Sequence, residues 1–181
     1  MPYQIKTLTP EHAQAYSRLM LEALALEPLA FTSSVQERAS LPPAWWRQRL
    51  AGFAQAGEQI LGLYCDEELV GCVGLVLQAR QRIRHKALVS GLYVAPGHRG
   101  QGGARQLMQA LLQLASTRPE LRLLQLTVTA GNHGAERLYQ QLGFQCYGEE
   151  PEAVRLGEGF VSKKLMWRRL STPKESGHAG T

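Results

Sequence analysis

A glycine-rich turn between a strand and a helix is the feature that most restricts what this chain can fold into. From Ser90 to Arg105 the sequence reads S-G-L-Y-V-A-P-G-H-R-G-Q-G-G-A-R, so an apolar strand runs into a turn that opens a helix. Unpaired N–H groups and the dipole at a helix N-terminus attract anions, and glycine lets a ligand approach the backbone. With Arg99 adding a positive charge, the turn predicts a phosphate or diphosphate site.

Neither common nucleotide-binding loop fits this turn. A Walker loop ends in Gly-Lys-Ser/Thr, which the sequence lacks here. A dinucleotide fingerprint needs a third glycine where Arg105 stands, and its ribose-binding acid ends the next strand, whereas Glu120 precedes that strand. A plain chain reversal therefore stays open as an alternative for the turn taken alone.

The composition is that of an ordinary globular domain. The chain has 181 residues, of which 44% are hydrophobic, enough for one domain with a sizeable core. No apolar run is long enough to span a membrane, and the first residues do not resemble a signal peptide. Cys65, Cys72 and Cys146 show no paired spacing, which excludes a disulfide-built mini-protein. We expect a cytoplasmic protein.

Positive charge is concentrated in the middle of the chain. The formal net charge is +5, yet no Asp or Glu occurs between Glu68 and Glu120. This basic segment predicts a localised anionic partner, with a solvated basic face as the alternative. A nucleic acid is not favoured, because the segment lacks interleaved aromatic residues and a groove-reading motif.

Hydrophobic periodicity predicts one α/β domain over residues 1–170 and a disordered polar tail over 171–181. Gly91, inside an apolar strand, indicates either a β-bulge that frees backbone groups for a ligand or a glycine kept for packing. The expected strands are 3–7, 59–65, 69–79, 86–94, 121–129, 144–148 and 160–167, and the expected helices are 10–27, 42–53, 103–117 and 132–142.

Two blocks in this arrangement resemble a known family. The first is Leu92-Tyr93-Val94-Ala95-Pro96 followed by Arg99-Gly100-Gln101-Gly102-Gly103-Ala104, and the second is Asn132, Ala135, Leu138, Tyr139, Gly143 and Phe144 in the pattern N-x-x-A-x-x-L-Y-x-x-x-G-F. Together, and in this order, they resemble the GCN5-related N-acetyltransferase (GNAT) superfamily, in its bacterial small-domain type. The resemblance implies a mixed, mostly antiparallel sheet of six to seven strands flanked by about four helices and splayed between strands 86–94 and 121–129.

The resemblance also implies a reaction. An acetyl group would pass from acetyl-CoA to a primary amine by direct attack, and Tyr139 would protonate the leaving thiolate. Without the resemblance, Tyr139 is equally a core residue on the apolar stripe of its helix. The residues that the resemblance places at the cofactor are Leu92, Tyr93, Val94, Arg99, Gly100, Gln101, Gly102, Gly103, Ala104 and Asn132; the last is also a good helix N-cap.

The acceptor side is less defined. Glu22, Phe31 and Glu37 are the candidates there, no general base is assigned, and no metal-ligand spacing is present. Residues 148–159 are expected to form a polar loop with a net charge of −3, which would favour a cationic amine if the loop rims the acceptor site, or would simply be solvated. Alternative functions are an acyl-CoA-binding regulatory module without turnover and an acetyltransferase for protein N-termini or lysines. A homodimer is an open alternative by analogy with the family.

Overall fold

A computed structural model describes residues 2–170 as one seven-stranded sheet with helices on both faces. The predicted tail, 171–181, lies outside the described residues. The strands are β1 (Tyr3–Thr7), β2 (Glu58–Cys65), β3 (Glu68–Leu77), β4 (Lys86–Val94), β5 (Leu123–Thr129), β6 (Gln145–Leu156) and β7 (Gly159–Arg169). The α-helices are α1 (Ala13–Leu26), α2 (Val35–Ala39), α3 (Pro43–Arg49), α4 (Phe53–Ala56), α5 (Gly103–Ser116) and α6 (His133–Gln141).

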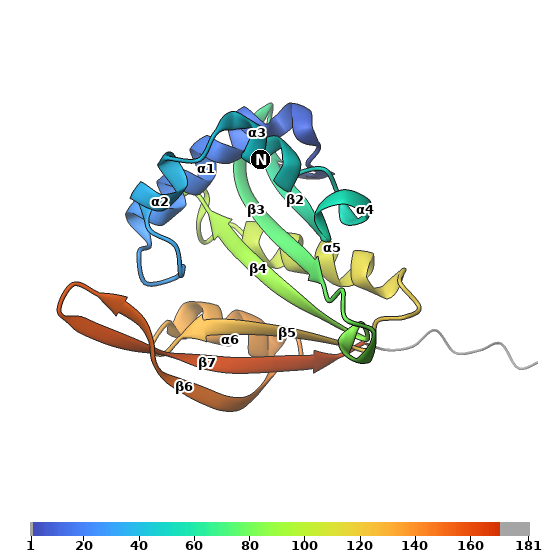
Figure 1. Ribbon diagram of the computed structural model, residues 1–181, viewed down its shortest axis with the longest axis vertical. Coiled ribbons are helices and arrows are strands. Elements are labelled where there is room, and N and C mark those ends of the chain that lie inside the picture. The colour runs from blue at the N-terminus through green and yellow to red at the C-terminus, as the bar shows by residue number, and fades with distance from the viewer. Residues whose placement is uncertain (1, 171–181) are drawn as a thin grey trace, which may run out of the picture.

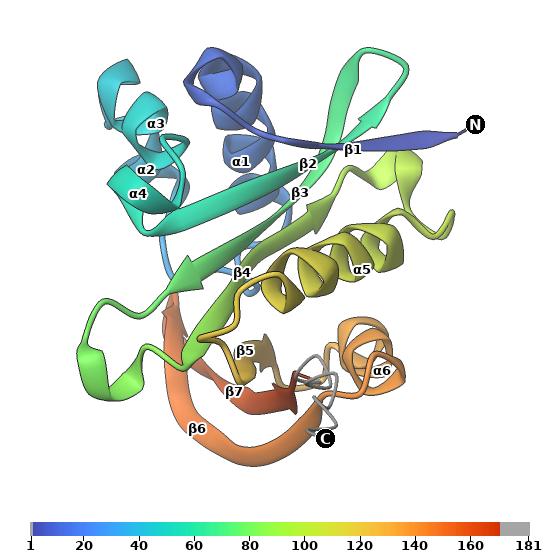
Figure 2. The ribbon, with the colours of Figure 1, turned by 90° about the vertical axis from the view of Figure 1, so that its right-hand side faces the viewer.

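The sheet runs in the order β1-β2-β3-β4-β5-β7-β6, and every neighbouring pair is antiparallel except β4 and β5 (Figure 1). This confirms the predicted fold class. Helices α1 and α3 cover one face, and α5 and α6 cover the other (Figure 2). None of the helices within residues 2–170 is long and apolar enough to cross a membrane.

Alternation along the strands divides the core between the two faces. In β2, Leu61 and Leu63 pack in the cluster under α5, whereas Ile60 and Tyr64 belong to the cluster under α1. On α5 the fully buried positions keep the helical period, namely Leu107, Met108 and Leu111. Each such side chain contributes about 1.5–3 kcal/mol by burial, so α5 is held firmly on the sheet.

The structure has six α-helices in its described part, where about four were expected. The predicted helix 42–53 is shorter in the structure, where α3 ends at Arg49, and Gly52, whose φ of +80° lies outside the helical region, precedes the separate and unpredicted α4. The unpredicted α2 is a short helix started by a capping box, in which Ser34 and Glu37 bond each other's backbone amides.

The expectation of a polar loop over residues 148–159 is wrong. Most of this segment belongs to β6, which forms a long hairpin with β7. Strand β6 is the edge of the sheet, and charged residues suit an edge strand because they discourage pairing with other chains. In the register Glu149 faces Lys164 and Glu150 faces Lys163, so these polar residues occupy facing positions of two paired strands and not a loop.

The sheet splays open between β4 and β5. The two strands pair only from Lys86–Leu88 to Leu123–Gln125, and beyond these residues they diverge (Figure 1). A register shift against β3 marks a bulge at Gly91, which has a φ of +61°. Of the two alternatives for Gly91, the bulge is the one present, and among residues 2–170 the β5-facing edge of β4 has no neighbouring strand from Val89 onward.

The bulge should depend on a residue that tolerates left-handed backbone. A Cβ at Gly91 would meet no atom within 4 Å, so the cost of Gly91→Ala comes from the backbone alone. We expect a loss of about 1–2 kcal/mol in the free energy of unfolding, measured by urea denaturation. Gly97→Ala is the control, because Gly97 has equally open surroundings without a positive φ, and should lose less than about 0.5 kcal/mol. Equal losses in the two variants would contradict this account of the bulge.

Candidate functional site

Two adjoining cavities lie in the splayed part of the sheet. The smaller, of about 120 Å³, occupies the slot between β4 and β5 and is lined by Leu92, Asn132 and Tyr139 among others. The larger, of about 380 Å³, lies between the sheet and helices α1 and α3. The two share Phe31, Ser90 and Gly91 in their walls. A long molecule in the slot would therefore meet a small molecule in the larger cavity beside the bulge.

The glycine turn presents unpaired amides at one end of this slot. Gly100 and Gly102 have φ values of +73° and +84°, and a Cβ on either would meet nothing within 4 Å. No side chain caps the start of α5, and the first backbone bond into the helix runs from Gln106 N to Gly102 O. The amides of the first turn are thus free to bind an anion.

The side chains of the turn are occupied by structural contacts. Arg99 donates through Nε to the carbonyl of Val94 at 3.0 Å and forms an ion pair of 2.8 Å with Glu27. Gln101 donates to the carbonyl of Gly97 and accepts from the hydroxyl of Tyr3. These bonds hold the turn open, so its backbone is the part available to a ligand.

Tyr139 reaches the slot from α6. Its ring packs edge-on against Phe144 at 5.9 Å between centroids, and the amide of Phe144 bonds the carbonyl of Tyr139 across Gly143, which has a φ of +83°. The residue is 7% exposed, and burial raises the pKa of its phenol to about 12. Among the hydrogen bonds of the described residues, none uses the Tyr139 hydroxyl, which stays protonated and available to donate.

Asn132 and Glu136 fix the start of α6. The Asn132 side chain accepts from the amide of Ala135 at 3.1 Å, so it is the N-cap of the helix as well as part of the slot wall. Glu136 accepts from the amide of Gly131 and from Lys164 Nζ at 2.8 Å, and the bond from Lys164 is the main reason that the pKa of this carboxyl is lowered.

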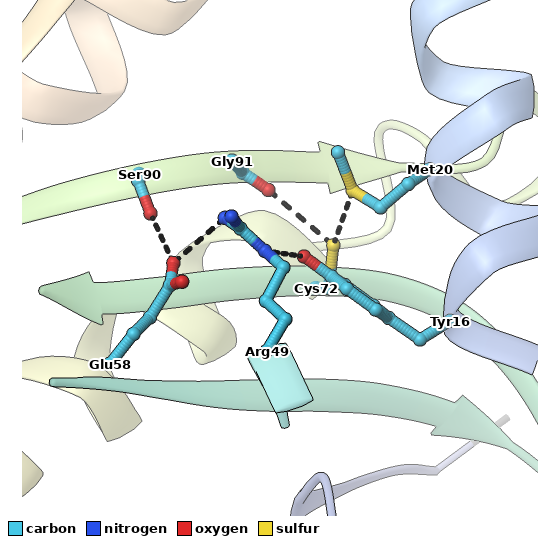
Figure 3. A network of polar contacts seen from close by, with 7 residues as sticks. All are labelled: Tyr16, Met20, Arg49, Glu58, Cys72, Ser90 and Gly91. Atoms are coloured by element: carbon cyan, nitrogen blue, oxygen red, sulfur yellow. Dashed lines mark hydrogen bonds and ion pairs between the residues drawn. The ribbon is translucent and has the colours of Figure 1, made fainter. Parts of the chain in front are cut away.

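A buried carboxylate that sequence reasoning missed lies behind Ser90, a residue that lines both cavities (Figure 3). Glu58 is 6% exposed, and its Oε1 accepts from Arg49 Nη2 at 2.9 Å and from Ser90 Oγ at 3.1 Å. Arg49 also donates through Nε to the hydroxyl of Tyr16 at 3.2 Å. The one sequence signal for Glu58 is its position two residues before Ile60, which places it on the α1-facing side of β2.

The bulge itself is held by sulfur contacts. Cys72 Sγ donates to the carbonyl of Gly91 at 3.4 Å and lies 3.6 Å from the sulfur of Met20 (Figure 3). Complete burial raises the pKa of this thiol to about 12, so it is neutral and acts as a structural donor.

The three candidates for the acceptor side fall in different places. Phe31 lines both cavities, in the connection between α1 and α2. Glu22 accepts from the hydroxyl of Tyr93 at 2.8 Å and lines a separate surface hollow, and Glu37 is exposed and caps α2. Within residues 2–170, no three His, Cys, Asp or Glu side chains gather into a metal-binding group.

Comparisons with known proteins agree with this geometry. The family model for the acetyltransferase (GNAT) family matches residues 20–144. The chain is 24% identical over 161 residues to spermidine N(1)-acetyltransferase of Vibrio cholerae, a match that covers 83% of this chain and 92% of that protein.

Solved structures share the fold. A GNAT-family acetyltransferase from Streptococcus pneumoniae superposes with a TM-score of 0.84 at 22% identity, covering 94% of this chain and all of the other. The yncA protein of Salmonella typhimurium, solved with its cofactor acetyl-CoA, superposes with a TM-score of 0.76 at 19% identity, covering 100% of this chain and 98% of the other. Because the family model spans more than half of the sequence, the chain belongs to the GNAT acetyltransferase family and is an acyl-CoA-dependent N-acyltransferase.

Proposed function

We propose that this protein transfers an acetyl group from acetyl-CoA to a primary amine by direct attack within a ternary complex. The observation that carries the proposal is the slot between β4 and β5, which has Tyr139 in its wall and adjoins the larger cavity, while β4 itself continues into the glycine turn whose free amides open α5. The acetyl-CoA in the similar yncA structure supports the choice of cofactor.

The cofactor would lie with its diphosphate on the backbone of residues 100–104 and its pantetheine arm along the unpaired edge of β4 at Leu92. Arg99 would support the diphosphate site indirectly, because its side chain is already bonded to Val94 and Glu27 and so fixes the conformation of the turn. Tyr93 would contribute backbone only, since its hydroxyl is bonded to Glu22.

In the chemical step the amine nitrogen attacks the thioester carbonyl carbon, a C–N bond forms, and the C–S bond breaks. Tyr139 donates its phenolic proton to the sulfur as negative charge develops there. The ammonium form of the amine must lose one proton before it attacks. Ser90 Oγ accepts that proton and passes its own to Glu58, because the Ser90 hydroxyl already donates to this carboxylate at 3.1 Å. The adduct loses a second N–H proton, which returns to the oxygen of Tyr139 and restores the phenol.

The diphosphate site can be tested with two isosteric variants of Gly102. Asn and Asp tolerate the left-handed backbone similarly well, and neither Cβ would meet an atom within 4 Å. Only Gly102→Asp places a negative charge beside the diphosphate. We expect calorimetry to give coenzyme A binding to Gly102→Asp weaker than to Gly102→Asn on the order of ten-fold. Equal affinities would remove this backbone from the diphosphate site.

The acid role is tested by Tyr139→Phe. We expect kcat/KM to fall by about 10²–10³-fold, while Tyr64→Phe, which removes another buried hydroxyl that has no partner in the described residues, leaves it within a factor of about two. Because burial raises the pKa of Tyr139 to about 12, the acid form persists as pH rises, and the wild-type rate should show no alkaline loss below about pH 10. A falling limb near neutral pH that vanished in Tyr139→Phe would contradict this assignment.

The proton path is tested by Ser90→Ala. Removing the hydroxyl should lower kcat/KM by about 10–100-fold near pH 7, where the amine is protonated. The deficit should shrink as pH approaches the amine's own pKa of about 10, since the free amine does not need the deprotonation before attack that Ser90 assists. Ser116→Ala on the exposed side of α5 is the control. A deficit that is constant across this pH range would argue against a proton path through Ser90.

A further inference from the structure

Lys163 is a buried cation to which the proposed reaction assigns no role. It is 4% exposed, and its Nζ donates to the carbonyl of Ala30 at 3.2 Å. In residues 2–170 no carboxylate lies within ion-pair distance of this ammonium. An ammonium carries three donors, and a buried charge is costly unless it is paired, so Lys163 has donors to spare for a ligand.

The side chain of Lys163 belongs to the floor of the larger cavity. Lys163 lies opposite Thr129 in the β5–β7 ladder, on the same side of the sheet as Thr127 and Gln125, both of which line that cavity. Its neighbour Lys164 faces the other side, where it pairs with Glu136. Lys163 and its partner Ala30 are both part of the cavity wall.

The opposite wall of the cavity adds more positive charge. Arg38 and Arg49 both lie over the ring of Trp45, with guanidinium carbons 4.7 Å and 5.5 Å from its centroid. Glu58 neutralises Arg49, whereas Arg38 has no carboxylate within ion-pair distance among the described residues. Burial and repulsion from Arg49 both lower the pKa of Arg38, which an anion beside it would reverse.

Among residues 2–170, no acidic residue lines the larger cavity, and this bears on the expected acceptor. The four glutamates of residues 148–159, which led to the expectation of a cationic amine, lie on β6 and in its turn and are absent from the cavity wall. Burial lowers the pKa of Lys163, and Glu150, which faces it across the ladder, opposes this shift only in part, because Glu150 is exposed and makes no ion pair with the lysine. Lys163 and Arg38 therefore line the cavity without an ion-pair partner among the described residues.

We propose that the acceptor carries a carboxylate as well as the reacting amine, and that Lys163, with Arg38 on the opposite wall, binds this carboxylate. The proposal rests on the proposed N-acetyltransferase function and names its substrate class as small amino acids and related amino-carboxylates. A cavity of about 380 Å³ lined by aromatic side chains suits a molecule of that size. Binding the carboxylate at Lys163 would leave the amine free to reach Ser90 and the thioester.

The experiment measures thiol release from acetyl-CoA with matched acceptors. Phenethylamine and L-phenylalanine differ by one carboxylate. The third acceptor is spermidine, the polyamine in the name of the Vibrio cholerae relative. We expect the wild-type kcat/KM to be at least about ten-fold higher for L-phenylalanine than for phenethylamine, with spermidine the poorest of the three.

Lys163→Met keeps the length of the side chain and removes its charge. We expect it to raise KM for L-phenylalanine by about 10–100-fold while kcat and KM for phenethylamine stay within about three-fold. Lys6→Met, at an exposed position on β1, is the matched control and should change neither acceptor. Arg38→Met provides a second variant if Lys163→Met fails to fold, and should raise KM selectively for the carboxylate-bearing acceptor.

The outcomes separate this inference from the proposed function. If the wild-type kcat/KM for phenethylamine or for spermidine equals or exceeds that for L-phenylalanine, the carboxylate site is overturned. The proposed acetyltransferase function would still hold. Equal losses in kcat for both aromatic acceptors in Lys163→Met and Arg38→Met would overturn it also, because a specificity residue should act on one acceptor. Absence of thiol release with every amine would instead count against the proposed function.

Discussion

The divergence of β4 from β5 is the constraint on which the rest of the site depends. Two parallel strands that stayed paired would leave no space between them, and here pairing ends after three residue pairs. The bulge at Gly91 turns β4 away, and the buried thiol of Cys72 holds the carbonyl of that glycine. The slot, the position of Tyr139 in its wall and the meeting of the two cavities at Ser90 all follow from this geometry.

Burial of charge is handled differently on the two sides of the slot. Glu58 and Arg49 neutralise each other, Ser90 donates a further bond to Glu58 Oε1, and Arg49 Nε donates to Tyr16, so the charges of this pair are compensated inside the protein. Lys163 has a carbonyl as its partner and no counter-charge within ion-pair distance among the described residues. This contrast between a compensated pair and a neighbouring cation without a counter-charge is the observation from which we propose a carboxylate site at Lys163.

Local sequence signals predicted the parts of the site that are built from consecutive residues. The glycine turn, the bulge at Gly91 and the N-cap and C-cap of α6 each depend on conformations that a few residue types adopt, so they could be read directly. The fold class followed from the same elements. By contrast, Glu58 and Ser90 are 32 residues apart and meet only because β2, β3 and β4 pair in register.

Two errors had a common physical origin in charged residues. Residues 148–159 were expected to be a loop because they are polar. An edge strand, however, can carry polar side chains on both faces while its backbone is paired with a neighbouring strand along one edge. The sequence did not indicate that Lys163 is buried, because a serine precedes it and a second lysine follows it. Only the alternation of side chains along β7 places Lys163 and Lys164 on opposite faces of the sheet. Charge alone does not tell which face of a strand is buried.

The connection between α1 and α2 spans the open end of the divergent strands. Thr129 Oγ1 donates to the carbonyl of Leu29 at 2.6 Å and Lys163 to that of Ala30, while Glu27 at the end of α1 pairs with Arg99 on the glycine turn (Figure 1). Residues 27–30 are therefore bonded to both sides of the gap, to β5 and β7 on one side and to the glycine turn after β4 on the other. If the gap between β4 and β5 widened to admit a long, flexible molecule, the contacts of residues 27–30 with both sides of the gap would be strained. Entry of such a molecule into the slot is therefore coupled to these contacts.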